Sequence, residues 1–253
     1  FYYTEDTTHA YYKITHYTQN TDGATWTEYA SSQAVGDIGT TYTADPLTIP
    51  GFTYDSTVEG TVASGELTAG GLELKLYYIR NEYPYQVRYL EQGTGKPLAN
   101  PKDGKGRYGA VISEAAIPIE DYDPVTSTPQ TLNIRIEESQ TEAKLNVITF
   151  YYQEQDVTIQ YQVVGPEGCG TVTLASETVK VLSGTAIGST ATASSEEYRF
   201  VGWYSDAACT TRVSADSKYV PEKVAGKNVA ATYYAKFEPN QGSLTIEKTV
   251  KGG

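Results

Sequence analysis

Two histidines, His9 and His16, are the residues best suited to bind a metal or to act as a general base. A metal pair would need both side chains on one face of a strand, beside a carboxylate or a thiolate. The two positions are seven residues apart, and on a continuous strand an odd spacing places side chains on opposite faces. The sequence therefore predicts no metal site, and no Ser-His-Asp set can be assembled around these histidines.

Acidic residues are densest at Glu120, Asp121 and Asp123. Paired carboxylates serve glycoside hydrolysis, and carboxylate oxygens also bind Ca²⁺. The segment lacks the order of acidic residues and glycine that is typical of a calcium loop, and Pro124 follows it directly. We therefore interpret it as a solvated turn. Together with the histidines, this indicates a protein that is not an enzyme and needs no cofactor.

Two cysteines, Cys169 and Cys209, lie in turn-like contexts, in the sequences PEGCGT and DAACTT. They are either two unpaired small residues or one disulfide bond. We favour the disulfide, because an extracellular module with no other cysteine cannot mispair. The bond would close a loop from residue 169 to residue 209. By restricting the unfolded chain, such a bond would stabilise the folded state by about 3–4 kcal/mol before any strain is subtracted.

Aromatic and basic side chains offer a different chemistry, the binding of sugars. Trp26 follows a predicted turn, and Tyr17 and Tyr29 lie on polar strand faces, so their rings are candidates to stack on sugar rings. Trp203 lies in the alternating segment RFVGWY and is more typical of a core. A small basic cluster is either a solvated loop or a contact for sialic acid or sulfated glycans, and it comprises Lys102, Lys105 and Arg107.

Alternating sequence predicts the strands that position these side chains. In residues 72–78 and 157–163, every second residue is aliphatic or Tyr, and the residues between are mostly polar. A period of two is typical of half-buried, mainly antiparallel strands. Hairpin turns are predicted after the first strand of each repeat, at residues 20–23, 92–95 and 165–168.

A tyrosine pair recurs along the chain and each time ends an apolar stretch. The second tyrosines of the pairs are residues 3, 78, 152 and 234, at intervals of 75, 74 and 82 residues. Nearly even spacing of a strand-end signature indicates tandem repeats of one small module. Within the second repeat, the segment AVISEAA after Gly109 has helical character and stops before Pro118. We expect a small sheet that is covered on one face by one short helix.

The overall composition excludes several classes of partner. The 253 residues carry a net charge of −12, which argues against binding to nucleic acid or to an anionic membrane surface. No apolar run approaches the roughly 20 residues that a membrane helix needs. The chain begins inside a strand-like segment, without an initiator Met, so we expect a piece of a longer protein whose targeting signals lie elsewhere.

These repeats resemble modules of Gram-positive bacterial surface proteins. The middle repeat, from YQVRYLEQGTGKPLANPKDGKGRYGAVI to ITFYYQ, resembles the MucBP (mucin-binding protein) repeat. The third, with RFVGWYSDAACTTRV and YYAKFE, resembles the internalin B-repeat, or Listeria–Bacteroides repeat. The first, with YKITHYTQNTDGATWTEY, is similar to related modules in adhesins of gut bacteria. The resemblance covers nearly all of residues 9–238 and implies a β-grasp, ubiquitin-like fold.

We therefore expect a mainly β chain of small α+β modules, three tandem β-grasp-like repeats that form an extended rod. The expected parts are a remnant of a preceding repeat at 1–8, repeats at 9–80, 81–154 and 155–238, and a linker with the first strand of a following domain at 239–253. The tail GSLTIEKTVKGG resembles the start of a pilin-like, isopeptide-bonded domain, in which Lys248 would stand at the position of the isopeptide lysine. Within this chain Lys248 is an ordinary surface lysine.

The resemblance implies a monomeric, non-enzymatic stalk or adhesin that is extracellular and attached to the cell wall. Host mucin or extracellular-matrix glycoprotein is the expected partner, bound weakly and multivalently. The alternatives are a carbohydrate-binding appendage of a large secreted glycosidase, and a spacer without a ligand.

Overall fold

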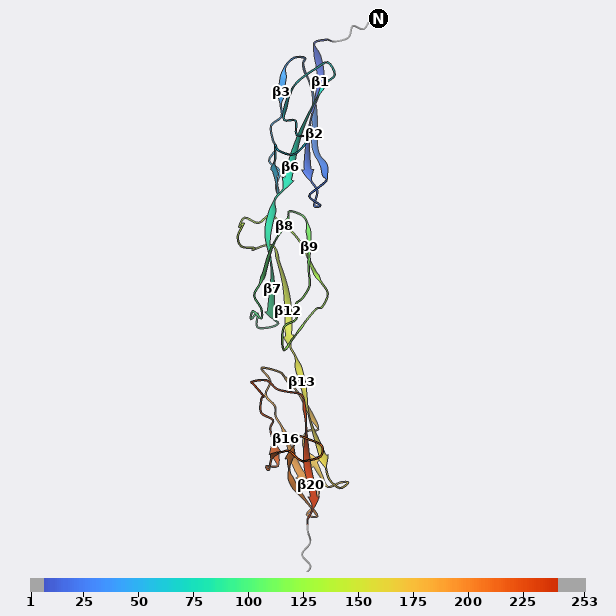
Figure 1. The fold of residues 1–253 in the computed structure, drawn as a ribbon, viewed down its shortest axis with the longest axis vertical. Coiled ribbons are helices and arrows are strands. Elements are labelled where there is room, and N and C mark those ends of the chain that lie inside the picture. The colour runs from blue at the N-terminus through green and yellow to red at the C-terminus, as the bar shows by residue number, and fades with distance from the viewer. Residues whose placement is uncertain (1–6, 241–253) are drawn as a thin grey trace, which may run out of the picture. The chain divides into compact units, whose positions relative to one another are not determined.

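The computed structural model describes residues 7–240, and none of these residues is in a helix. Figure 1 shows the strands and loops that these residues form. They make two compact units, one of residues 7–117 with 124–152 and one of residues 118–123 with 153–240. In this part of the chain no helix is long and apolar enough to cross a membrane. The predicted mainly β class is confirmed.

The first main sheet is formed by residues 9–80 in the order β2-β1-β6-β4, and β3 and β5 form a separate pair. The turn at residues 20–25 joins β1 to β2 as an antiparallel hairpin, as the sequence predicts. The strands are β1 (His9–Gln19), β2 (Trp26–Asp37), β3 (Thr41–Thr43), β4 (Phe52–Tyr54), β5 (Ser64–Glu66) and β6 (Leu72–Arg80).

The second main sheet has the order β10-β12-β7-β8, and β11 and β9 form a separate pair. The strands are β7 (Glu82–Glu91), β8 (Lys102–Arg107), β9 (Val111–Glu114), β10 (Tyr122–Pro124), β11 (Gln130–Asn133) and β12 (Val147–Glu154).

The third main sheet has the order β15-β13-β20-β17-β18, and a three-stranded sheet has the order β14-β16-β19. The turn at residues 165–168 leads into β14, but β14 pairs with β16 and not with β13, so the hairpin predicted there is wrong. The strands are β13 (Asp156–Val164), β14 (Gly170–Val172), β15 (Ser176–Lys180), β16 (Ser189–Ala193), β17 (Tyr198–Tyr204), β18 (Arg212–Ser214), β19 (Lys218–Tyr219) and β20 (Ala231–Pro239).

All three main sheets share one plan. The first and last strands of each sheet lie side by side and run parallel: β1 with β6, β7 with β12, and β13 with β20. The expectation of mainly antiparallel strands is therefore incomplete. Alternation reveals which face of a strand is buried but does not give the direction of its neighbour, and a parallel pair needs a long crossover connection.

The short helix predicted after Gly109 is wrong. Val111–Glu114 forms β9, which pairs antiparallel with β11 from Val111↔Asn133 to Glu114↔Gln130. Val111 and Ile112 are β-branched, and such residues favour strands because their χ1 angles are restricted in a helix. The helix of a β-grasp plan is therefore replaced, among residues 7–240, by short strands and loops.

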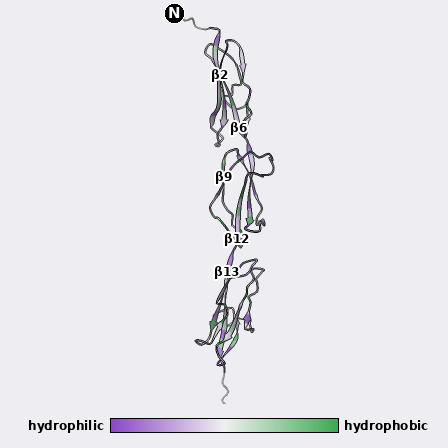
Figure 2. Cartoon of the chain, turned by 180° about the vertical axis from the view of Figure 1, so that it is seen from behind, coloured by the Kyte–Doolittle hydropathy of each residue, from purple (hydrophilic) through white to green (hydrophobic). Residues whose placement is uncertain are grey.

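The tyrosine pairs occupy the last strand of each main sheet, where one ring enters the core. Tyr78 and Tyr152 are fully buried, and Tyr77 and Tyr151 lie on the other face of β6 and β12. In the third sheet the arrangement is reversed, since Tyr233 lies opposite buried Tyr161 in the parallel register and packs against the core. Figure 2 shows short hydrophobic stretches on several strands.

Candidate functional site

Three aromatic rings meet on the outer face of the first main sheet. On β1, His16 and Thr18 are buried, so Tyr17 between them points to the other face. Tyr17 lies opposite Tyr77 in the parallel register, and the two rings stack with centroids 5.0 Å apart. Trp26 meets Tyr77 edge-on at 4.9 Å. All three residues are partly exposed, and we name Tyr17, Trp26 and Tyr77 the aromatic cluster.

Charged groups border the aromatic cluster on the same face. Lys75 precedes Tyr77 by two residues on β6, and its Nζ lies 2.9 Å from Glu73 Oε2. This hydrogen bond raises the pKa of the Lys75 ammonium, with a smaller effect from the charge of Glu73. Glu28 lies opposite Tyr17 on β2. Flat rings rimmed by hydrogen-bonding groups are suited to a sugar, which presents an apolar ring face and polar hydroxyls.

The structure brings together two of the three aromatic residues that the sequence singled out. Tyr29 is exposed and lies at a β-bulge, where β1 shifts from pairing with Ala30 to pairing with Glu28. Within residues 7–240 it makes none of the ring contacts of the aromatic cluster. Tyr77 was missed as a site residue. The alternation of residues 72–78, which buries Tyr78, already places Tyr77 on the polar face.

The three predicted basic residues do not form one cluster. All three lie on β8, where Lys102 occupies the face of Gly104 and Gly106, and Lys105 and Arg107 occupy the other face. Lys102 Nζ lies 2.7 Å from Glu114 Oε2, and Glu114 also accepts a hydrogen bond from the Tyr85 hydroxyl at 2.8 Å. The Lys102 charge is therefore paired.

Arg107 instead lies beside the first hairpin turn. Its guanidinium is so close to Gly23 that a Cβ atom there would come within 2.6 Å of Arg107 Cζ. The pKa of Asp22 in this turn is lowered to about 2, mainly by hydrogen bonds from Thr25 and Ala24 and in small part by the charge of Arg107. A hollow of about 590 Å³ opens here, lined among others by Gln19, Arg80 and Arg107.

The predicted disulfide is not formed, and both cysteines are free. Beside β20, β13 runs parallel and β17 antiparallel, so the loops that follow these two strands leave from opposite ends of the sheet. Cys169 lies in the first of these loops and is buried, and Cys209 lies in the second and is partly exposed. Burial raises the pKa of the Cys209 thiol.

The acidic segment at 120–123 pairs with a lysine. Lys227 Nζ lies 2.6 Å from Glu120 Oε1 and 2.6 Å from Asp121 Oδ2, and Asp123 accepts a hydrogen bond from Gln155 Nε2 at 2.8 Å. Across the described residues, no group of three or more His, Cys, Asp or Glu side chains is placed to hold a metal ion.

The remaining candidates have structural positions. His16 is buried and its Nδ1 lies 2.8 Å from the Tyr78 hydroxyl, whereas His9 is exposed and pairs with Asp37. Trp203 is fully buried and donates from Nε1 to the Ser217 carbonyl, so its interpretation as a core residue is confirmed. Lys248 lies outside the described residues.

Three solved structures are among those to which this chain is similar. The structure titled "The Bacillus anthracis TIE protein" is 10% identical, covers 91% of this chain and 51% of that chain, and gives a TM-score of 0.41. The crystal structure of Mub-RV is 8% identical over 57% of this chain and 98% of that one, with a TM-score of 0.21. The type 2 repeat of the mucus binding protein MUB from Lactobacillus reuteri is 10% identical over 56% and 99%, with a TM-score of 0.20.

This chain spans about half the length of the Bacillus anthracis protein. A comparison with curated proteins gave no match.

The Listeria-Bacteroides repeat domain matches residues 158–225. This family and the MucBP domain family comprise adhesion or repeat modules that are typical of extracellular surface proteins. The MucBP domain matches residues 13–79 and 85–179, more than half of the chain. The chain therefore belongs to the MucBP domain family.

Proposed function

We propose that this chain is a non-enzymatic stalk and adhesive segment of a Gram-positive surface protein that is secreted and attached to the cell wall. Its modules at 9–80, 81–154 and 155–238 form an extended, monomeric rod. The rod displays an adhesive tip and itself binds mucin glycoprotein weakly. Two MucBP matches in one chain support this assignment.

The aromatic cluster is the observation that carries the proposed binding. Tyr17, Trp26 and Tyr77 present three contacting rings that are only partly covered. A sugar ring stacks on such a surface through its apolar face, while the ammonium of Lys75, two residues before Tyr77 on β6, donates hydrogen bonds to its hydroxyls. Such an open surface gives a weak site, because a shallow contact buries little of the ligand.

Weak single sites are compatible with firm attachment, because a mucin presents many glycans. A dissociation constant of about 1 mM corresponds to only about −4 kcal/mol. Linked binding events raise the overall avidity by about 10²–10⁴ without any new contact, provided that the linkage permits simultaneous binding. The proposed function therefore requires repetition and not a deep pocket.

The two tryptophan indole N–H signals make a direct NMR test. Residues 1–253 are titrated with mucin O-glycans up to millimolar concentration. The Trp26 signal should shift with saturation, and the Trp203 signal should stay in place, because its indole is buried and bonded to Ser217. If neither signal moves and mucin is not retained, the chain is a spacer without a ligand.

The alternative is a carbohydrate-binding or spacer appendage of a large secreted glycosidase. The full-length gene distinguishes it from the proposed adhesin. A catalytic domain in the same polypeptide would support the appendage, and a C-terminal sorting signal with further repeats would support the adhesin.

A further inference from the structure

A single residue, Asn81, joins the first main sheet to the second, and its backbone is bonded on both sides. It lies between β6 and β7. Its N–H donates to the Gly51 carbonyl at 2.9 Å, and its carbonyl accepts from the Tyr108 N–H at 2.9 Å. Gly51 precedes Asn81 on the chain and Tyr108 follows it. The Asn81 N–H therefore bonds to an earlier residue, and the Asn81 carbonyl bonds to a later one.

Gln155 repeats the same pattern within the second unit. It lies between β12 and β13, its N–H donates to the Asp121 carbonyl at 2.8 Å, and its carbonyl accepts from the Val181 N–H at 3.0 Å. The two acceptors are equivalent, since Gly51 and Asp121 both have positive φ, +81° and +65°. We name Asn81 and Gln155 the junction residues.

Side chains strengthen both junctions. At the first, Thr53 Oγ1 donates to Asn81 Oδ1 at 2.7 Å, and at the second, Gln155 Nε2 donates to Asp123 Oδ1 at 2.8 Å. Thr53 and Asp123 each lie two residues after the acceptor carbonyl. Both junction residues are half-buried.

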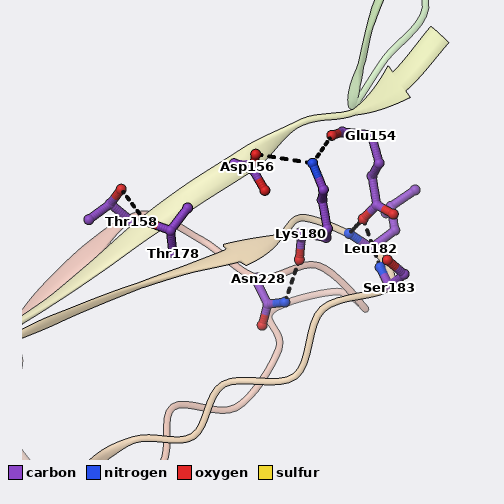
Figure 3. A network of polar contacts seen from close by, with 8 residues as sticks. All are labelled: Glu154, Asp156, Thr158, Thr178, Lys180, Leu182, Ser183 and Asn228. Atoms are coloured by element: carbon purple, nitrogen blue, oxygen red, sulfur yellow. Dashed lines mark hydrogen bonds and ion pairs between the residues drawn. The ribbon is translucent and has the colours of Figure 1, made fainter. Parts of the chain in front are cut away.

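Neighbouring residues then fix the strand that follows the second junction. Lys180 Nζ donates to the Glu154 carbonyl at 2.8 Å and to Asp156 Oδ2 at 3.0 Å (Figure 3). Glu154 Oε1 accepts from the backbone N–H groups of Leu182 and Ser183. These bonds hold the start of β13 against the segment around Lys180.

Asn240, at the end of the third sheet, makes the first of these two bonds, the bond from its N–H to an earlier residue. It follows β20 directly, and its N–H donates to the Glu197 carbonyl at 2.7 Å. Its Nδ2 donates to the Glu196 carbonyl at 2.5 Å. Pro239 and Asn240 are exposed, whereas the corresponding positions at both junctions are half-buried.

At the third sheet an aromatic residue follows the residue whose carbonyl accepts the junction bond, as it does at the first junction. At the first junction Phe52, which follows the acceptor Gly51, meets the Tyr108 ring edge-on at 6.0 Å. At the third sheet Tyr198 follows the acceptor Glu197 and lines a hollow of about 470 Å³ with Pro166, Pro239 and Asn240. This hollow is therefore the place where a ring equivalent to Tyr108 would pack.

We infer that this surface is the seat of a further β-sheet module that follows in the same polypeptide. The module donates a backbone N–H to the Asn240 carbonyl and packs an apolar side chain on Tyr198 and Pro239. The occupant is a module of the same chain because the polypeptide continues directly from Asn240, so a module that follows is held beside this surface at a high effective concentration. The inference does not depend on glycan binding.

Hydroxyl-radical footprinting tests the seat in residues 1–253 and in the full-length polypeptide. Tyr198 and Pro239 should be labelled at least threefold more slowly in the full-length protein, and exposed Tyr151 should be labelled equally in both. Equal labelling of Tyr198 in the two proteins would overturn the inference. Protection in residues 1–253 that grows with concentration would also overturn it, because a second copy would then be the occupant.

A pair of variants of the full-length protein tests the junction bond itself. Asn240→Pro removes the N–H that donates to Glu197, whereas Asn240→Gly keeps this N–H and removes only the side chain. Asn240→Pro should abolish the protection of Tyr198, and Asn240→Gly should retain most of it. Full protection in both variants would contradict the role of the junction bond.

Discussion

The hydroxyl of Tyr152 bonds both backbone groups of Ile117: it accepts from the Ile117 N–H at 3.1 Å and donates to the Ile117 carbonyl at 2.8 Å. Tyr78 holds the corresponding loop of the first sheet, where its hydroxyl accepts from the Leu47 N–H at 2.8 Å. In both sheets the buried tyrosine of the pair therefore fixes the long crossover loop between the parallel strands. Burial raises the pKa of both hydroxyls, so they stay protonated and able to donate.

Tyr152→Phe should lower the free energy of unfolding by about 1–3 kcal/mol, because the Ile117 backbone groups lose their partner while the ring still fills the core. Urea denaturation measures this change, and amide exchange at Ile117 localises it. Tyr151→Phe is the matched control, since Tyr151 is exposed. Equal stability of the two variants would contradict the role of the hydroxyl.

His16 should make the first sheet sensitive to mild acid. Desolvation lowers the pKa of its imidazole below the ordinary value of 6.5. The unfolded chain then binds more protons than the folded one, so stability is complete above about pH 6.5 and is lost as the pH falls toward the folded pKa. Thermal unfolding between pH 8 and pH 5 measures the loss.

The two histidines of the chain provide the control for this pH dependence. His9→Gln should keep the His16 component, because His9 is exposed, and His16→Gln should remove it. If the pH dependence of the two variants is the same, His16 does not cause it.

Arg80 should couple the first two sheets. Its Nε donates to the Gln19 carbonyl at 2.5 Å, its Nη1 donates to the Tyr108 carbonyl at 2.6 Å, and its Cζ lies 4.8 Å from the centre of the Phe52 ring. Hydrogen bonds from a charged group contribute about 1.5–3 kcal/mol. Arg80→Met should therefore speed amide exchange at Tyr108 by about tenfold or more.

Arg88→Met provides the reference for this measurement, because exposed Arg88 bonds only to neighbouring Gln86 among the described residues. It should leave exchange at Tyr108 unchanged. Unchanged exchange in Arg80→Met as well would show that the backbone bonds of Asn81 hold the junction without Arg80.

The two thiols should differ in reactivity. With an aromatic disulfide reagent at pH 8, native protein should release about one equivalent of thiolate, from Cys209, and a second only after unfolding, from buried Cys169. Cys209→Ser should remove the fast phase. An intact mass lower by two protons under non-reducing conditions would instead show that Cys169 and Cys209 form the disulfide bond predicted from the sequence.

Alternation predicted the strands correctly but could not predict which strands are neighbours. The segment at 157–163 forms most of β13, yet it pairs with β15 and β20 and not with β14, the next strand along the chain. The segment after Gly109 was misread because its glutamate and alanines suit a helix, while its pairing with β11 decides in favour of a strand.

The candidate site, like the fold, could be predicted from the sequence only in part. Tyr17 and Trp26 were singled out as aromatic residues on polar positions, but the ring between them, Tyr77, comes from a strand about 60 residues away in sequence. Lys102 and Arg107 looked like one cluster because they are close in sequence, and the period of the strand separates them. Contacts between distant strands are therefore the part that sequence reasoning lacked.

Surface plasmon resonance on immobilised mucin, comparing Tyr77→Ala with Tyr151→Ala in residues 1–253, tests directly whether the aromatic cluster binds mucin. Removal of the Tyr77 ring takes away the partner of both Tyr17 and Trp26, and each good aromatic contact contributes about 0.5–1.5 kcal/mol. Tyr77→Ala should weaken binding about fivefold or more, and Tyr151→Ala should bind like the unchanged chain. Equal mucin binding by the two variants, with both folded, would contradict the proposed site.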